Sequence, residues 1–170
     1  MDFGRYTTPG AALAADLVNA RHAGAPLDRP TGYPDDAPWT SAIAAWLAAV
    51  ADQLRPAFVT DDQAEAAAAV NRLLGDLPLV PRLTAHDGKP AHLHYAPADA
   101  DAPTRLACNA AMAVAAIVSE HGVRRLKLCA APSCGAAFID TSRNGRRRFC
   151  SPSCANRTHV AAHRRRTGRR

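Results

Sequence analysis

In the first half of the chain, apolar residues recur every three to four positions, which is the period of a helix with one buried face. This pattern predicts three helices, over 10–21, 39–54 and 61–74. Thr60 or Asp61 is a suitable N-cap for the third helix. Residues 24–38 hold four prolines, which interrupt regular backbone hydrogen bonding, so we expect a long surface loop there.

The period changes near residue 79. Two short runs, 79–85 and 91–95, flank the pair Asp87-Gly88, and together they predict a β-hairpin. The most apolar segment follows over 102–121 and ends at Gly122, as expected for a central buried helix with a glycine cap. The fold class predicted for residues 1–122 is therefore α+β: a mostly helical domain with a small hairpin.

Charge divides the chain into two unequal parts. Residues 1–120 carry 8 basic and 14 acidic side chains, whereas residues 121–170 carry 13 basic side chains and one acidic side chain, Asp140. An acidic body followed by a basic segment is typical of a protein whose C-terminal part meets a polyanion. A solvated basic tail is the simpler alternative.

The apolar segments also bear on location. By inspection, no apolar run reaches the roughly 18 residues that a membrane span needs, and residues 1–5 do not resemble a signal peptide. We therefore expect a cytoplasmic protein that has no membrane partner.

Four of the five cysteines lie close together near the C-terminus, as Cys-x4-Cys, fifteen intervening residues, and Cys-x3-Cys: Cys129, Cys134, Cys150 and Cys154. Two close pairs suit tetrahedral zinc, because each pair can fold back so that both thiolates reach one ion at about 2.3 Å. Four thiolates fill the coordination sphere and leave no position for an activated water. The spacing therefore predicts one structural zinc ion, which the module needs in order to fold.

The residues between the cysteines indicate how the chain brings the pairs together. Pro132 and Gly135 suit a tight turn in the first pair, and Asn144-Gly145 predicts a hairpin that joins 138–139 to 148–149. Ser151-Pro152 suits the start of a closing helix. We expect a treble-clef-like zinc module over 123–166, followed by a disordered basic tail at 167–170.

Other assignments of the cysteines and histidines stay open. Two disulfides are an alternative to zinc, and His159 or His163 could replace a cysteine as ligand. Cys108 is expected to be a small buried hydrophobe rather than a nucleophile. His92 and His94 have the spacing of two ligands on one strand face, but no third histidine or carboxylate is expected beside them, so a solvated face is the simpler interpretation.

Arginines supply almost all of the basic excess, and their guanidinium groups suit phosphates and guanine edges. One or two of them, Arg157 and Arg148, could instead neutralise the tetrathiolate zinc. The candidate nucleic-acid-binding residues are Arg143, Arg146, Arg147, Arg148, Arg157, Arg164, Arg165 and Arg166. Because no aromatic residues alternate with them, duplex DNA is favoured over single strands.

The run from Leu128 to Arg166, above all 140–150 and Cys154-Ala-Asn-Arg157, resembles the CGNR zinc-finger family of bacterial proteins. The resemblance implies an N-terminal ABATE domain and a role as a stress-induced transcription regulator. Ala155 stands where the family signature has glycine. Alanine is tolerated in a helix, so we expect the finger to form.

These observations predict a cytoplasmic, nucleoid-associated DNA-binding regulator whose N-terminal domain senses a small molecule or a protein. The alternative is a zinc-stabilised protein-interaction module that does not contact nucleic acid. Residues 1–120 contain no recognisable phosphate loop, serine elbow or carboxylate pair, so no enzyme is expected.

Overall fold

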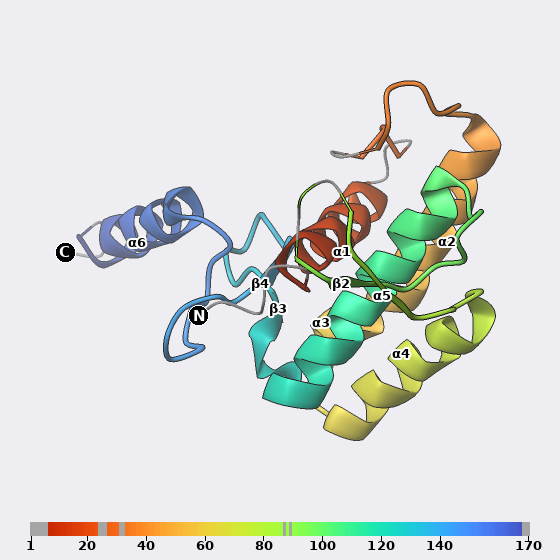
Figure 1. Cartoon of the computed structure of the whole chain (residues 1–170). Coiled ribbons are helices and arrows are strands. Elements are labelled where there is room, and N and C mark those ends of the chain that lie inside the picture. Colours follow the sequence, from red (N-terminus) through yellow and green to blue (C-terminus); the bar gives the residue numbers. More distant parts are fainter. Residues whose placement is uncertain (1–6, 24–26, 31–32, 87, 89, 168–170) are drawn as a thin grey trace.

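The computed structural model describes residues 7–23, 27–30, 33–86, 88 and 90–167 (Figure 1). The helices are α1 (Thr7–His22), α2 (Ser41–Leu54), α3 (Pro56–Val59), α4 (Gln63–Asp76), α5 (Ala102–His121) and α6 (Pro152–Thr167), with a 3-10 turn η1 (Val123–Arg125). The strands are β1 (Arg82–Thr84), β2 (His92–His94), β3 (Leu126–Leu128) and β4 (Ala137–Ile139). They form two separate two-stranded antiparallel sheets.

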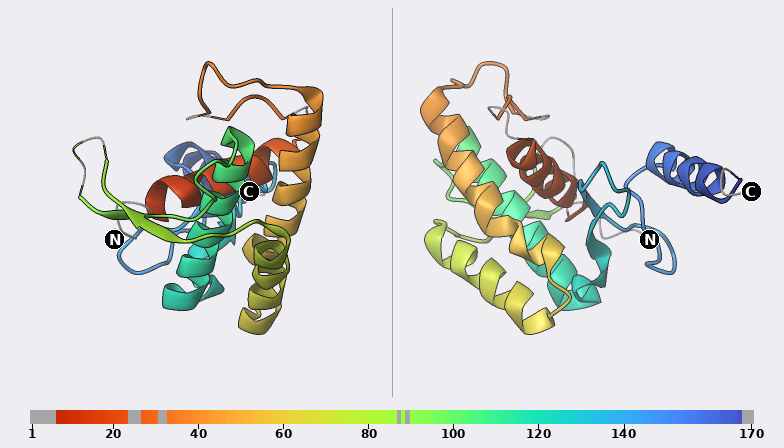
Figure 2. Two further views of the ribbon diagram at one scale, coloured as in Figure 1. Left: turned by 45° about the vertical axis from the view of Figure 1, so that its right-hand side comes forward. Right: turned by 180° about the vertical axis from the view of Figure 1, so that it is seen from behind.

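The predicted central helix is confirmed as α5, which lies between α1, α2 and α4 (Figures 1 and 2). Its alanines allow close packing, and Val114, Ile117 and Cys108 are at most 1% exposed. Burial raises the pKa of the Cys108 thiol, which suits a packing residue rather than a nucleophile. The helix ends at His121, and Gly122 is its C-cap, as expected.

The close approach of α1 to α5 depends on Gly10. A Cβ atom added at this position would lie 2.7 Å from the carbonyl oxygen of Asn109 and 2.9 Å from the Cβ of Ala113. Both atoms belong to a rigid helix, so a side chain at Gly10 would push the helices apart.

The three helices predicted before residue 75 are confirmed as α1, α2 and α4, with one different cap and one extra helix. The side chain of Asp62, rather than Thr60 or Asp61, accepts hydrogen bonds from the Ala64 and Glu65 amides. The additional short helix, α3, begins at Pro56, a residue whose fixed φ suits a first helical position. In the proline-rich loop, the described residues 27–30 and 33–38 contain no helix or strand.

The predicted first hairpin is confirmed by the pairing of Arg82 with His94 and of Thr84 with His92. Asp87 of the expected turn lies outside the described residues. The expected tail at 167–170 also lies outside them, except for Thr167, which ends α6.

The C-terminal module is attached to the helical body through its own small sheet. Leu126 and Ala137, from β3 and β4, are buried in the same hydrophobic core as α1 and α5. The Asn19 side chain accepts a hydrogen bond from the Ala137 amide (2.6 Å) and donates one to the Ala137 carbonyl (2.9 Å). Beyond this sheet the module leaves the body, and α6 projects away from it (Figure 2).

Two segments among the described residues are long and apolar enough to cross a membrane by length and composition alone, Ser41–Val59 and Ala102–His121. The expectation that no segment reaches this length is therefore wrong. The signal is weak, because Ala102–His121 includes α5, the central core helix, and such helices satisfy the same criterion.

Candidate metal centre

The four sulfur atoms of Cys129, Cys134, Cys150 and Cys154 lie within 4.8 Å of one another. The Sγ of Cys150 is 3.7 Å from the Sγ atoms of both Cys134 and Cys154. With metal–sulfur bonds of about 2.3 Å, tetrahedral geometry places neighbouring sulfurs about 3.8 Å apart. A disulfide needs about 2.05 Å, so these separations fit one metal ion and not two disulfides.

The first cysteine pair sits on a tight turn between β3 and β4, as expected. The Cys129 amide donates to the Ala136 carbonyl (2.8 Å), and the Cys134 amide donates to the Ala131 carbonyl (3.0 Å). Gly135 has a φ of 61°, in the left-handed region that favours glycine. The turn therefore brings the two sulfurs of this pair to one side.

The predicted hairpin at Asn144-Gly145 is wrong. The strand Ala137–Ile139 pairs with Leu126–Leu128 instead of with residues 148–149, and residues 140–151 form no strand. The asparagine-glycine pair does form a turn, in which the Gly145 amide donates to the Ser142 carbonyl. The second pair returns to the first through a loop, not through a second strand.

Asp140 organises that loop. Its carboxylate is fully buried and accepts hydrogen bonds from the Ser142 amide (3.0 Å), the Arg147 amide (2.8 Å) and Lys127 Nζ (2.8 Å). Burial alone would raise the pKa of Asp140, but these donors and the Ser142 hydroxyl outweigh burial and lower it to about 2. Backbone amides of the loop therefore donate to the Asp140 carboxylate, whereas in the expected hairpin they would have donated to a second strand.

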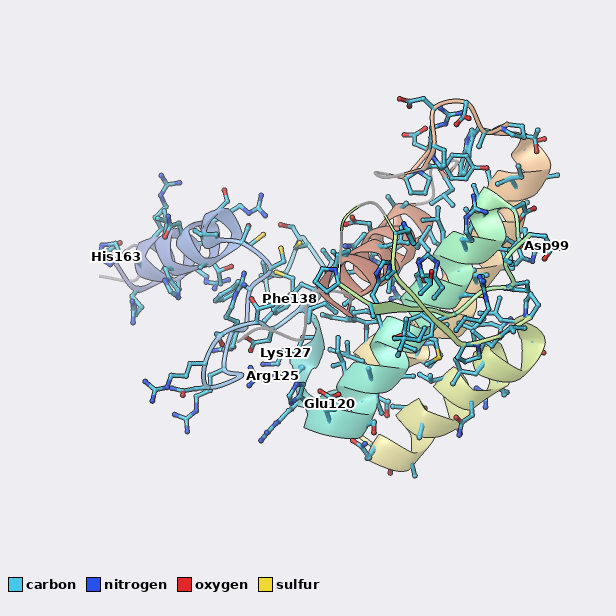
Figure 3. All side chains as sticks on the ribbon, viewed as in Figure 1. Asp99, Glu120, Arg125, Lys127, Phe138 and His163 are labelled. Atoms are coloured by element: carbon cyan, nitrogen blue, oxygen red, sulfur yellow. The ribbon has the colours of Figure 1, made fainter. Side chains whose placement is uncertain are left out.

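Two cationic side chains, Lys127 and Arg125, also hold the same loop. Lys127 Nζ also donates to the carbonyls of Gly145 (2.7 Å) and Arg147 (3.0 Å). Arg125 is 3% exposed and donates to the carbonyls of Asp140 and Ser142. Both lie close to Phe138 (Figure 3). Sequence reasoning missed these roles, although Asp140 is the only acid in the basic segment.

The closing helix α6 begins as predicted. Pro152 is its first residue, and the Ser151 hydroxyl accepts a hydrogen bond from the Cys154 amide (3.2 Å). Cys154 is the buried residue of this helix and faces the other sulfurs. Ala155 fits within its first turn, as expected from its helix propensity.

The electrostatics of the four sulfurs favour a bound cation. Burial and the neighbouring sulfurs raise the pKa of Cys150 to about 12, whereas the Ser151 hydroxyl lowers that of Cys154 to about 7. The four groups do not become thiolates together without a positive charge among them. Arg157 Nη2 lies 3.3 Å from the Cys154 sulfur, and the Cys150 amide lies 3.4 Å from the Cys129 sulfur. These donors suit a tetrathiolate centre that carries negative charge.

The two histidines considered as ligands lie elsewhere. The His159 ring packs edge-on against Phe149 at 5.8 Å between ring centroids. His163 is exposed further along α6 (Figure 3). The cysteine cluster is complete without either.

The candidate nucleic-acid-binding arginines divide into two groups. Arg147 donates to the Cys150 carbonyl and covers the Phe138 ring, and Arg157 contacts the Cys154 sulfur, so both serve the module's own structure. Arg148 lies over the Phe149 ring and is exposed. The remaining candidates, all exposed, are Arg143 and Arg146 in the loop, and Arg164, Arg165 and Arg166 at the end of α6.

A second cluster lies in the helical body, and it corrects the prediction for His92 and His94. His86 joins them, so a third histidine is present, and His92 is 7% exposed rather than solvated. Burial, followed by the charges of His92 and His86, lowers the pKa of His94. The signal available in the sequence was alternation along the hairpin: the pairs Arg82–His94 and Thr84–His92 share one face, and residue 86, two positions beyond Thr84, continues that face.

Comparison with known families agrees with the cysteine geometry. Residues 125–167 match the CGNR zinc finger family model. Together with the clustered sulfurs, this match assigns one structural zinc ion to the module. No curated protein matches the chain. The family resemblance is thus supported for the finger, and the ABATE assignment of residues 1–122 stays a prediction.

Proposed function

We propose that this protein is a transcriptional regulator that binds duplex DNA through its zinc finger. The observation that carries the proposal is α6. This helix has 16 residues, of which Cys154 is the buried one, and the rest of the described protein leaves most of its surface uncovered. Short helices without packing are marginal in water, so a basic helix held only at its start is suited to a partner that covers it.

The dimensions and charges of α6 favour the DNA major groove. A helix of this length spans about 24 Å, and the major groove, about 12 Å wide, admits a helix. Arg164, Arg165 and Arg166 lie in its last turn, beside His163. The loop arginines Arg143 and Arg146 provide a second set of cations for phosphates on the backbone.

The proposal includes the finer predictions made for the whole chain. The finger over 123–166 is treble-clef-like, with a turn, a short sheet and a closing helix. Residues 1–122 form an ABATE-type domain that senses a small molecule or a protein, and the protein acts at the nucleoid in the cytoplasm. No catalytic activity is part of the proposal.

The experiment is a salt titration of binding to a labelled duplex, measured by fluorescence anisotropy with the zinc-loaded full chain. Each phosphate contact adds about 0.9 to the slope of log K against log salt. We expect replacement of Arg164, Arg165 and Arg166 by alanine to reduce the slope by about 2 to 3. Replacement of Arg143, Arg146 and Arg148 should act in the same direction.

The matched control removes arginines that are exposed outside the finger, Arg21→Ala with Arg72→Ala. This variant should keep the wild-type slope. Absence of duplex binding at low salt, or an equal loss of slope in the control, would contradict the proposal.

The charge division favours a second candidate, in which the basic finger meets the acidic body of another copy or an acidic protein. Sedimentation of the nuclease-treated full chain distinguishes the two. Salt-sensitive self-association without nucleic acid supports the interaction module, whereas a monomer that binds duplex DNA supports the regulator.

A further inference from the structure

The three histidines of the β1–β2 hairpin converge on one point. The Nε2 atom of His94 lies 3.0 Å from His86 Nε2 and 2.9 Å from His92 Nε2. His92 and His94 come from β2 and His86 from the segment after β1, and the ring centroids are 4.8 to 5.0 Å apart. Three nitrogens of the same type thus face a common centre.

The hydrogen bonding of His92 fixes which of its nitrogens is available to a metal. Its Nδ1 lies 3.0 Å from the Pro90 carbonyl oxygen. A carbonyl only accepts hydrogen bonds, so Nδ1 carries the proton, and in the neutral ring Nε2 holds a lone pair. A histidine ligand whose second nitrogen donates to a carbonyl is the usual arrangement at metal sites.

The separations between the nitrogens fit one coordination sphere. With metal–nitrogen bonds of about 2.0–2.1 Å, ligands at right angles lie about 2.9 Å apart, and tetrahedral ligands about 3.3 Å apart. The observed 2.9 and 3.0 Å fit ligands at right angles around one ion, and all three ligand atoms lie within 4.8 Å of one another. Three protein ligands leave at least one coordination position for a further ligand.

The histidines also lie in the wall between two cavities of about 330 and 310 Å³, both lined by His86, His94, Tyr95 and Asn109. Arg82 and Arg105 line the larger cavity. The Nε of Arg82 is buried and has no hydrogen-bond partner among the described residues. The two guanidinium groups that line this cavity suit an anionic ligand.

We propose that His86, His92 and His94 bind a borderline divalent metal ion of the Zn²⁺ class, whose open position faces the arginine-lined cavity and takes the carboxylate of a small ligand. Imidazole suits zinc, copper and nickel. Three protein ligands with an open position distinguish this site from the closed tetrathiolate finger. The inference does not depend on DNA binding by the finger, and it gives the helical body a site at which a signal could be received.

The test for the metal is equilibrium dialysis of the full chain at micromolar free Zn²⁺, with zinc per chain measured by plasma mass spectrometry. We expect two ions in the wild type, and one in both His86→Ala and His94→Gln. His86 is exposed, so its replacement leaves the fold intact. His163→Ala, an exposed histidine on α6, is the control and should retain two. One ion in the wild type, or two in both hairpin variants, would overturn the metal site.

The open position is tested with Co²⁺ in the histidine site and acetate as the carboxylate. We expect acetate to shift the visible Co²⁺ absorption saturably, and Arg82→Gln to weaken this binding about tenfold, because a charge-assisted hydrogen bond is lost. Arg72→Gln, on the exposed face of α4, should bind acetate as the wild type does. A spectrum that does not respond to acetate would overturn the open position while leaving the metal stoichiometry as a separate result.

Discussion

At the scale of single residues, the finger depends on Asp140 as well as on its cysteines. The carboxylate joins Lys127 from β3 to the amides of Ser142 and Arg147, on the two sides of the loop. It therefore fixes the path that carries Cys150 back to Cys129. Removing this charge leaves Lys127 without its buried partner.

Asp140→Asn should destabilise the finger by about 2–4 kcal/mol at neutral pH. The pH dependence of this stabilisation follows from the pKa of Asp140. Because the folded pKa of Asp140 is lowered to about 2, its stabilisation is present above the unfolded pKa of about 4 and is lost as pH falls towards 2. The mutant is best measured near pH 7, since acid also releases zinc. Thermal unfolding of the zinc-loaded protein measures the change.

The exposed loop residue Asp99 provides the control. Asp99→Asn should change stability by no more than about 0.5 kcal/mol. Equal effects of the two substitutions would show that the Asp140 carboxylate is not what holds the loop.

Much of what the sequence could not predict also belongs to the residue scale. Asn144-Gly145 correctly predicts a turn, but a turn signal does not say whether strands flank it. Here the Asp140 carboxylate takes the hydrogen bonds that a strand would have made. Similarly, the spacing of His92 and His94 was visible, while His86 joins them only through the pairing of two strands. Local sequence patterns predict contacts between residues that are close in sequence. The contacts of Asp140 and His86 cross a loop, so these patterns did not predict them.

At the scale of elements, the helical period of the apolar residues and the spacing of the cysteines predicted more of the structure than the turn signals did. The stripes predicted α1, α2, α4 and α5, because each of these helices buries one face in a shared core. The four ligands followed from spacing alone, since a tetrahedral thiolate site strongly limits the loops that can build it. No stripe predicts α6, which buries only Cys154; it followed from the Ser-Pro start signal.

The contact between α1 and α5 provides a prediction with a built-in control. Gly10→Ala should destabilise the protein by about 1–3 kcal/mol, because its Cβ would meet the Asn109 carbonyl oxygen at 2.7 Å. Gly75 also lies in a helix, α4, and nothing lies within 4 Å of an added Cβ. Gly75→Ala should therefore stabilise the protein by about 0.4–1 kcal/mol.

Urea unfolding followed by circular dichroism measures both changes. Opposite signs for the same chemical substitution would identify the close approach of the two helices as the cause. Stabilisation by Gly10→Ala would mean that α1 and α5 have more room than the structure shows.

At the scale of the whole molecule, the finger and the helical body pack against each other, but they differ in what stabilises them. The body has a core of its own, to which the buried residues of the finger contribute Leu126 and Ala137. The second half of the finger, from Asp140 through α6, contacts mainly its own residues and the zinc ligands. Zinc should therefore control the order of this half far more than that of the helices before it.

Cys134→Ser, which removes one zinc ligand, should speed amide exchange across residues 129–167 while α2, α4 and α5 keep their protection. Hydrogen exchange read by mass spectrometry resolves these segments. Cys108→Ala removes a thiol from α5 outside the zinc cluster and should leave exchange in the finger unchanged.

The end of α1 is the informative boundary: Asn19 holds the Ala137 backbone, so faster exchange there would show that loss of zinc reaches the body through this contact. Unfolding of all helices in a single transition would instead mean that the helical body does not stay folded without the zinc-bound finger.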